Sequence, residues 1–272
     1  VAIAFFGIMC AQGAVWYFAF FYMQVFLEKS LGIPAATKDM LLIIMTVVSA
    51  PLYVFFGWLS DRVGRKPVML AGMLLALALY FPGSHLIARA SNPALVAAQE
   101  ATPVIVETDP ITCSSQFDPT GTAKFTSACD IAKSTLVTKG IGYSSRNSAD
   151  GDTYISVGSQ KAHILTAEGY SDGDLKHFKK IVADDVGIML QMAGYPKSAD
   201  PATANMPLLI TVLLLFVVAA TALYGPQAAA LVEMFPTRIR YTAMSLPYHV
   251  GTGWVGGFLP ATSFAIVAIT GD

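Results

Sequence analysis

The sequence predicts an all-α polytopic membrane protein with five transmembrane helices and a small α+β domain inserted between the third and the fourth. Two features predict this class: five long stretches lack charged side chains, and one intervening segment has the composition of a soluble protein. The 272 residues are 54% hydrophobic and only 13% charged, against about a quarter in soluble domains. Buried helices of a large soluble protein are the alternative, but those are usually shorter and apolar on one side only.

Each charge-free stretch has 20 residues or more, enough to cross a hydrocarbon core about 30 Å thick at about 1.5 Å per residue. The stretches are Val1–Leu27, Met40–Leu59, Pro67–Ile87, Met206–Val232 and Tyr241–Gly271. The first one has neither a basic leader nor a small-residue cleavage site, so it is predicted to be a span and not a signal peptide.

The segment 88–205 holds ten of the 17 basic residues and 13 of the 18 acidic ones. Its stretches 102–108 and 152–168 are rich in β-branched residues and partly alternating, which predicts strands. Asp174–Ala193 repeats apolar residues at helical spacing and is predicted to be a helix capped by Asp172 or Asp174. The insert is therefore predicted to be a small α+β unit.

Cys113 and Cys129 are the only cysteines of the insert. In an oxidising compartment such a pair would form a disulfide and stabilise its loop by roughly 3 kcal/mol. Two unpaired thiols are the alternative. A zinc site is disfavoured because the sequence has no CxxC and because His163 and His177 are not at ligand spacing, so no metal is expected.

Lys and Arg in short loops indicate which ends of the spans face the cytoplasm. The loop after the second span carries Arg62, Arg65 and Lys66, and the loop between the last two carries Arg238 and Arg240. Both loops lie on one side if every run spans once. We therefore expect both loops to be cytoplasmic and residues 91–205 to be extracytoplasmic.

The loop sequence GWLSDRVGRKPVML, residues 57–70, resembles the cytoplasmic signature of the major facilitator superfamily. Seven positions match that signature: Gly57, Leu59, Asp61, Arg62, Gly64, Arg65 and Lys66. The neighbouring WYFAFFYMQVFLEKSLG and the later LVEMFPTRIRYTAMSLPYHVGTGWVGG are similar to the metabolite:proton symporter branch, which carries α-ketoglutarate, citrate, shikimate, proline and betaine.

The resemblance implies that the five spans are helices 7 to 11 of a twelve-helix carrier. Residues 1–90 then hold helices 7 to 9, residues 91–205 the insert, and residues 206–272 helices 10 and 11. The resemblance also implies that the N-terminal half of the same carrier is a missing partner, and that the protein lies in the inner membrane of a bacterium.

The function implied is secondary active transport, by proton-coupled symport of a small organic metabolite that is a carboxylate or a zwitterion. The alternative is a non-transporting, carrier-like scaffold whose extracytoplasmic domain is a ligand-binding or sensory module. No GxSxG, Walker loop or HExxH motif occurs, so neither an enzyme nor a primary ATP-driven pump is indicated. No cofactor and no nucleic-acid partner is expected.

The charges of the signature loop are predicted to form a gating network that breaks and reforms during transport. Its predicted members lie in the two basic loops: Asp61, Arg62, Arg65, Glu233 and Arg238. Glu233 is the acid at the cytoplasmic end of the fourth span, so we expect it to pair with Arg62 or Arg65. The alternative is a set of solvated loop charges, with pairs worth about 0–1 kcal/mol.

Substrate contacts are expected from polar and amphipathic aromatic side chains inside the spans, because polar groups are costly in lipid. The candidates are Gln12, Trp16, Tyr17, Tyr224, Gln227, Tyr248 and His249. The alternatives are interfacial anchoring by the aromatic residues and hydrogen bonds between helices by the glutamines. His249 is also a candidate for a proton relay, although family members more often carry Asn there. The GxxxG formed by Gly253 and Gly257 predicts close helix packing.

Overall fold

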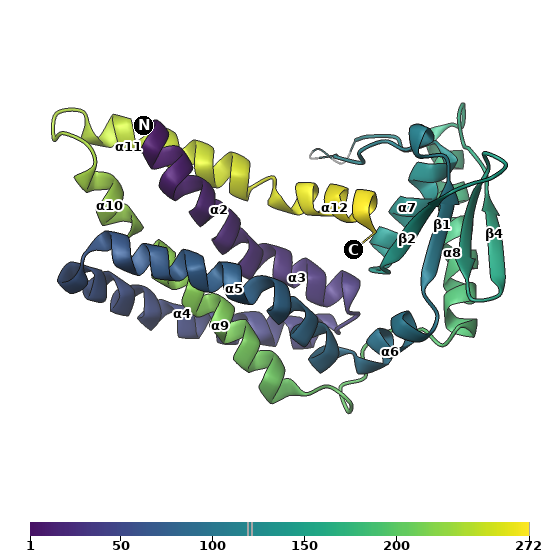
Figure 1. Cartoon of the computed structure of the whole chain (residues 1–272), viewed down its shortest axis with the longest axis horizontal. Helices are drawn as coiled ribbons and strands as arrows, with labels where there is room; N and C mark the ends of the chain where they lie inside the picture. The colour runs from purple at the N-terminus through teal and green to yellow at the C-terminus, as the bar shows by residue number, and fades with distance from the viewer. Residues whose placement is uncertain (119, 121, 272) are drawn as a thin grey trace. The chain divides into compact units, whose positions relative to one another are not determined.

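The computed structural model describes residues 1–118, 120 and 122–271. The chain forms two compact units (Figure 1). The helical unit comprises Val1–Val25, Pro34–Ser91 and Ala204–Pro260. The α+β unit comprises Phe26–Ile33, Asn92–Thr203 and the chain from Ala261 onwards.

Five helical segments of the described residues are long and apolar enough to cross a membrane, which confirms the five predicted spans. They are Ala2–Ser30, Ala35–Val63, Arg65–Ser91, Met206–Glu233 and Arg240–Thr270. Each extends a charge-free stretch at one or both ends. The added residues are largely polar, as expected where a helix leaves the hydrocarbon for water.

The first span alternates between α-helical and π-helical turns. Its successive segments are α1 (Ala2–Ala4), η1 (Phe5–Met9), α2 (Cys10–Tyr17), η2 (Phe18–Tyr22), α3 (Met23–Val25) and η3 (Phe26–Ser30). Single π-helical turns within a helix are rare and are frequent at functional sites. Two of them flank α2, which carries three of the candidate substrate residues.

The second and third spans are α4 (Ala35–Val63) and α5 (Arg65–Ser91), joined at Gly64. Gly64 has a φ of 95°, a conformation that glycine adopts without steric cost, so α4 ends there and α5 begins at once. The sharp turn brings the charged residues on its two sides close together.

The fourth span is broken in two at the Gly225–Pro226 pair. Helix α9 (Met206–Tyr224) ends at the break and α10 (Gln227–Glu233) begins after it. The last span consists of α11 (Arg240–Val250), the π-helical η5 (Gly251–Gly256) and α12 (Leu259–Thr270).

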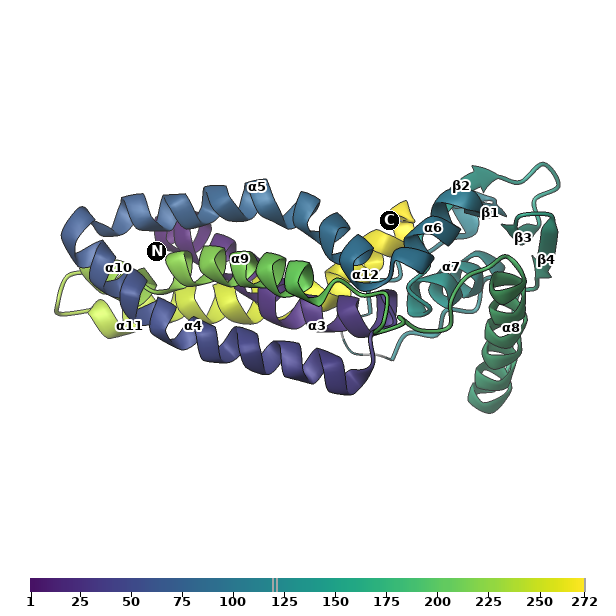
Figure 2. The same cartoon turned by 90° about the horizontal axis from the view of Figure 1, so that it is seen from below.

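Small residues allow the helices of the helical unit to pack closely. Helix α5 lies along α9, and both contact α4 (Figure 2). A Cβ at Gly72 of α5 would lie 2.9 Å from the backbone nitrogen of Leu223, so only glycine permits this approach. The expected GxxxG contact is different. A Cβ added at Gly253 would meet nothing within 4 Å, whereas Gly251 and Gly256 of η5 pack against the first span.

The α+β unit contains a four-stranded sheet in the order β2-β1-β3-β4. Its strands are β1 (Val104–Thr108), β2 (Tyr143–Asn147), β3 (Thr153–Val157) and β4 (Gln160–Ile164). Strand β1 is parallel to β2 and antiparallel to β3, and β3 and β4 form a hairpin. Alternate residues of β1 and β3 are buried, which gives the sheet one covered face.

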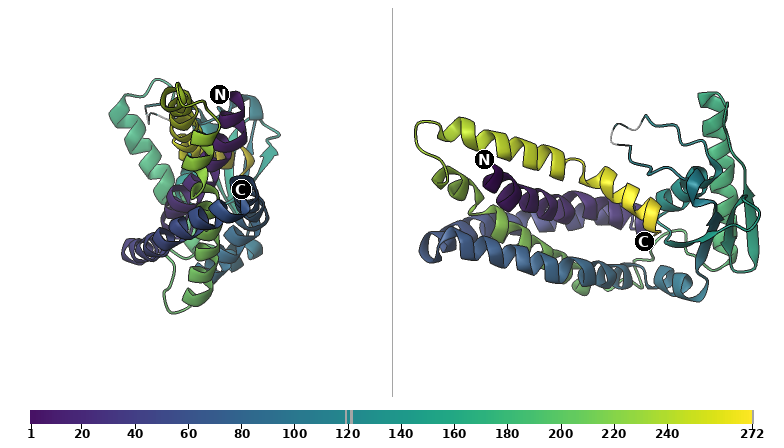
Figure 3. Two further views of the ribbon diagram at one scale, coloured as in Figure 1. Left: turned by 90° about the vertical axis from the view of Figure 1, so that its left-hand side faces the viewer. Right: turned by 45° about the horizontal axis from the view of Figure 1, so that its top comes forward.

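The helices of the α+β unit are α6 (Pro93–Ala101), the 3₁₀ turn η4 (Pro110–Thr112), α7 (Ala128–Thr138) and α8 (Asp172–Met192). Helices α7 and α8 contact the sheet, and α8 runs beside the strands in Figure 3. The predicted aspartate cap of α8 is wrong: Ser171 precedes the helix, and its hydroxyl accepts the backbone N–H of Asp174 at 3.3 Å.

A disulfide between Cys113 and Cys129 ties the loop after β1 to the start of α7. The buried carboxylate of Asp130 supports the same loop, because it accepts the backbone N–H of Ser114 at 2.8 Å and the Ser114 hydroxyl at 3.0 Å. Strand β2 reaches the end of α12, where the Tyr143 hydroxyl donates to the carbonyl of Ala268 at 2.6 Å.

Candidate functional site

An aromatic cluster links four helices of the helical unit. The indole N–H of Trp16 in α2 donates to the Tyr53 hydroxyl in α4 at 2.8 Å. The ring centroid of Tyr224, at the end of α9, lies 5.5 Å from that of Tyr53 and 6.0 Å from that of Trp16. The hydroxyls of Tyr224 and of Tyr248 in α11 are 3.3 Å apart. All four rings are half-buried, and their polar atoms pair in two contacts, Trp16 with Tyr53 and Tyr224 with Tyr248.

Two buried glutamine side chains lie next to this cluster. Gln12 is one helical turn before Trp16 and is 0% exposed, while Gln227 follows Tyr224 by three residues and is 1% exposed. The Gln227 amide donates only to the thioether of Met9, at 3.3 Å, and Met9 lies one turn before Gln12. The two glutamines therefore face the same interface between α2 and the broken fourth span.

The hydrogen bonding of these amides is incomplete. Neither side-chain atom of Gln12 has a partner in the described chain, and the same is true of the Gln227 carbonyl oxygen. An unpaired buried polar group costs about 1–3 kcal/mol, so three such atoms are a large cost for one small region. The flanking spans contain no charged residue here, so the region presents hydrogen-bonding groups and aromatic faces without a formal charge.

Five of the seven predicted substrate residues thus come together: Gln12, Trp16, Tyr224, Gln227 and Tyr248. Tyr17 stacks on Phe21 at 5.1 Å and packs against η5, so it borders the cluster. His249 is exposed on α11, with its ring 5.4 Å from that of Tyr248. Sequence reasoning missed Tyr53. The feature that could have identified it is a polar hydroxyl group inside the second charge-free stretch.

The signature loop forms a compact charge cluster at the end of α4. Arg65 binds Glu233 through Nε and Nη2, each 3.2 Å from Oε1, and its Nη1 also pairs with Asp61. The Ser60 hydroxyl accepts a further bond from Nη1 at 2.8 Å. Glu233 therefore pairs with Arg65, one of the two arginines expected for it.

The remaining predicted members of this network stand apart from the carboxylates. The Arg62 guanidinium lies 4.1 Å from the ring centroid of Trp58, a cation–π contact. Arg238 is exposed in the loop before α11, and no ion pair is found for it in the described part of the chain. The structure thus places one arginine between two carboxylates, an arrangement that can hold the ends of α4 and α10 together.

Within residues 1–118, 120 and 122–271, no group of three His, Cys, Asp or Glu side chains could hold a metal ion.

Comparisons with known proteins point to one superfamily. Residues 4–99 match the sequence profile of the Major Facilitator Superfamily, which covers the first three spans. Over 76 residues the chain is 36% identical to the ectoine/proline transporter ProP of Corynebacterium glutamicum. This alignment covers 28% of the chain and 15% of the relative. No solved structure shows a significant match. The chain is thus similar to the Major Facilitator Superfamily over its first three spans, and its five candidate membrane helices support a multi-pass membrane protein.

Proposed function

We propose that this chain serves secondary active transport, as a proton-coupled symporter of a small organic metabolite that is a carboxylate or a zwitterion. In this proposal its spans correspond to helices 7 to 11 of a twelve-helix carrier of the metabolite:proton symporter branch. Residues 91–205, the insert, lie on the extracytoplasmic side of a bacterial inner membrane in this proposal. The similarity to a protein named as an ectoine/proline transporter supports this class of function.

The observation that carries the proposal is the pair of buried, incompletely bonded amides beside the aromatic cluster. Carriers bind solutes near the bilayer midplane, where helices are broken and polar groups are otherwise too costly to keep. Gln227 lies directly after such a break, and Gln12 faces the same interface from α2. The free energy lost on burying these groups is recovered when a solute supplies the missing hydrogen bonds.

The chemistry of the site fits the proposed substrate class. The amide N–H groups of Gln12 and Gln227 can donate to a carboxylate. The faces of Trp16 and the tyrosines can attract a compact ammonium group through cation–π interactions. Because no formal charge lies in the cluster, a solute that carries its own counter-charge needs no buried ion from the protein to balance it.

The signature loop supplies the second part of the mechanism. Arg65 binds Asp61 and Glu233. We propose that these ion pairs keep the transport pathway closed at the ends of α4 and α10, and that they break when this gate opens. Exposed ion pairs are individually weak, about 0–1 kcal/mol each, which suits contacts that must be broken in every cycle.

Uptake into membrane vesicles tests this function. Vesicles containing the protein receive labelled proline, betaine, α-ketoglutarate, citrate or shikimate under an imposed inward proton gradient. The proposal expects uptake of at least one solute, loss of accumulation with a protonophore, and loss of uptake in Gln227→Leu at equal amounts in the membrane. Accumulation unaffected by the protonophore would contradict proton coupling.

A second candidate function rests on the α+β unit. This unit has its own sheet, a disulfide and a direct hydrogen bond from Tyr143 to the end of α12, so it can pass a ligand-induced change to that helix. Under this alternative the protein is a sensory scaffold. Correctly inserted protein without uptake, combined with solute binding by the α+β unit, would favour it over transport.

A further inference from the structure

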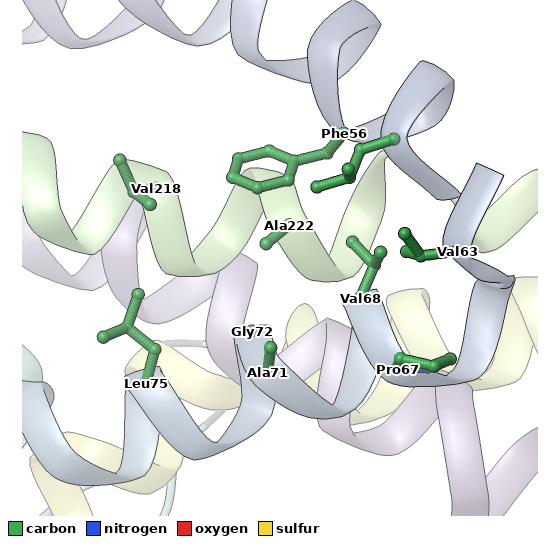
Figure 4. Close-up of a pocket in the computed structure, with 10 residues that line it drawn as sticks. Phe56, Val63, Pro67, Val68, Ala71, Gly72, Leu75, Val218 and Ala222 are labelled. Carbon is green, nitrogen blue, oxygen red and sulfur yellow. The ribbon is translucent and has the colours of Figure 1, made fainter. Parts of the chain in front are cut away.

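An apolar groove of about 330 Å³ runs between α4 and α5, with α9 as its floor (Figure 4). Leu59 and Val63 line it from α4, Pro67 and Ala71 from α5, and Val218 and Ala222 from α9. The side chain of Ala222 on the floor is small, and Gly72 of α5, which also lines the groove, lies close to the α9 backbone. The groove therefore exists because small residues stand where larger ones would fill it.

The lining excludes a polar solute. Every residue that lines the groove is apolar or glycine, whereas metabolite sites combine apolar walls with a few polar groups that orient the ligand. The groove lies within segments predicted to cross the hydrocarbon core. An alkyl chain is the occupant that such walls accommodate without any desolvation cost.

Positive charge accumulates at the end of the groove next to the signature loop. Val63 and Pro67, on the two sides of the turn, line this end. The charge of Arg65 is offset by two carboxylates, but no ion pair joins Arg62 or Lys66 to an acid in the described residues. These two cations, which flank Val63 and Pro67 in the sequence, remain available to an anion.

Trp58 indicates the depth in the membrane of the groove end next to the signature loop. Its side chain is 46% exposed, and it stands one turn before Arg62 on α4, beside the groove-lining Leu59. Exposed Trp residues near basic residues at the end of a span are typical of the headgroup region. The groove thus leads from the hydrocarbon to a basic site at headgroup depth.

We propose that this groove binds one acyl chain of an anionic phospholipid, whose phosphate is held by Arg62 and Lys66. The charge of the site is complementary to that headgroup, and the apolar lining is complementary to the chain. The lipid would rest against the turn that positions Asp61 and Arg65. This site is separate from the aromatic cluster and does not depend on transport.

Tryptophan quenching by brominated lipids tests the proposal. The chain carrying Trp16→Phe and Trp254→Phe keeps only Trp58 and is placed in nanodiscs with phosphatidylglycerol or phosphatidylcholine brominated in one acyl chain. Each of the two basic residues near an anionic surface contributes about 1 kcal/mol, so we expect an apparent binding constant about 30-fold higher for phosphatidylglycerol. Lys66→Gln should lower this ratio to about fivefold, and the further substitution Arg62→Gln should bring it close to one.

A substitution that fills the groove provides an independent test of the proposal. Ala71→Phe places a ring in the groove and should lower quenching by phosphatidylglycerol to the level of phosphatidylcholine, whereas Ala50→Phe, at an exposed position of α4 outside the groove, should not. Equal quenching by the two lipids in the unmodified background would overturn the proposal. Absence of quenching by either lipid would also overturn it, because a protein segment would then cover the groove.

Discussion

Two nitrogens of Arg65, Nε and Nη2, each lie 3.2 Å from the same carboxylate oxygen of Glu233, although the two residues are 168 positions apart. The same guanidinium also pairs with Asp61, four positions before it. One arginine side chain therefore joins the end of α4, the start of α5 and the end of α10. Gly64 makes this possible, because its positive φ turns the chain within a single residue.

Removal of either carboxylate should impair gating. We expect Asp61→Asn or Glu233→Gln to lower the initial rate of uptake by up to about fivefold, because each removes one of the two exposed ion pairs of Arg65. The measurement is uptake normalised to the amount of protein in the membrane. The matched control is Asp39→Asn, which removes a carboxylate near the other end of α4 and should be neutral. Unchanged rates in both loop variants would show that these charges are only solvated.

Asp150 provides a pH prediction outside the spans. Its carboxylate accepts the Ser148 hydroxyl at 2.6 Å, the Tyr154 hydroxyl at 2.8 Å and the backbone N–H of Asp152 at 3.1 Å. These bonds lower the pKa of Asp150 from 3.8 to about 2. A lowered pKa means that the ionised form stabilises the folded loop. Its contribution is complete above pH 3.8 and is lost as the pH falls through about 2.

Carbon-detected NMR of the side-chain carboxyl groups checks this value directly. Tyr154→Phe removes one donor and should move the midpoint of Asp150 upwards, toward the ordinary value. Tyr170→Phe changes a tyrosine elsewhere in the α+β unit and should leave it unchanged. A midpoint near 4 in the unmodified protein would contradict the hydrogen-bonded arrangement of the loop.

The disulfide should stabilise the α+β unit specifically. The double substitution Cys113→Ser and Cys129→Ser opens a loop with a sequence separation of 16, which should cost about 3 kcal/mol of unfolding free energy. Limited proteolysis of the α+β unit under increasing denaturant measures this loss. Cys10→Ser replaces the free cysteine of α2 and serves as the control. Equal protease resistance with and without reducing agent would argue against a stabilising disulfide.

The spans and the break after Tyr224 could be predicted because a long uncharged run has few stable environments, and a Gly–Pro pair interrupts helical hydrogen bonding. Other elements left weaker signals. Strand β2 has the polar sequence YSSRN and is ordered by its parallel pairing with β1, which is set by contacts distant in sequence. Helix α7 is short, and its buried side chains include the polar Asp130, Lys133 and Thr135, so the polarity of the sequence does not reveal its burial.

Most residues of the candidate site could be predicted from the local sequence, but the contacts between them could not. A polar side chain inside a span is visible in the sequence, so Gln12 and Gln227 could be named. Their common interface could not be derived, because it depends on how the first and fourth spans pack. The pairing of Glu233 with Arg65 likewise depends on how the third and fourth spans pack, and the Arg62 guanidinium lies over the ring of Trp58 instead.

Tyr53, which the sequence analysis did not name, should be needed to orient the cluster. Tyr53→Phe keeps the ring but removes the acceptor of the Trp16 indole N–H at 2.8 Å. Loss of this bond should weaken solute binding by about 1 kcal/mol, close to fivefold. Solute titrations followed by Trp16 fluorescence measure the affinity. Tyr80→Phe is the control, since that hydroxyl donates to the backbone carbonyl of Val15. Equal affinities of the two variants would remove Tyr53 from the site.

The buried glutamines should lower the stability of the solute-free protein and be required for solute uptake. Gln12→Leu and Gln227→Leu replace incompletely bonded amides by apolar side chains of similar length, so each should raise the thermal midpoint of the solute-free protein. The gain should approach 1–3 kcal/mol at most, roughly the cost of an unsatisfied buried group. Both variants should also lose uptake, because the removed groups are those that the solute is proposed to bind.

Gln24→Leu is the matched control in the same span. The Gln24 amide donates to the carbonyl of Phe20 at 2.8 Å, so its removal breaks an existing bond and should not raise the thermal midpoint. The opposite movement of stability and uptake in Gln12→Leu and Gln227→Leu is the distinguishing result, because residues that only bond helices together lose both when replaced. A lower midpoint in either variant would show that its amide is bonded within the protein and is not held for a solute.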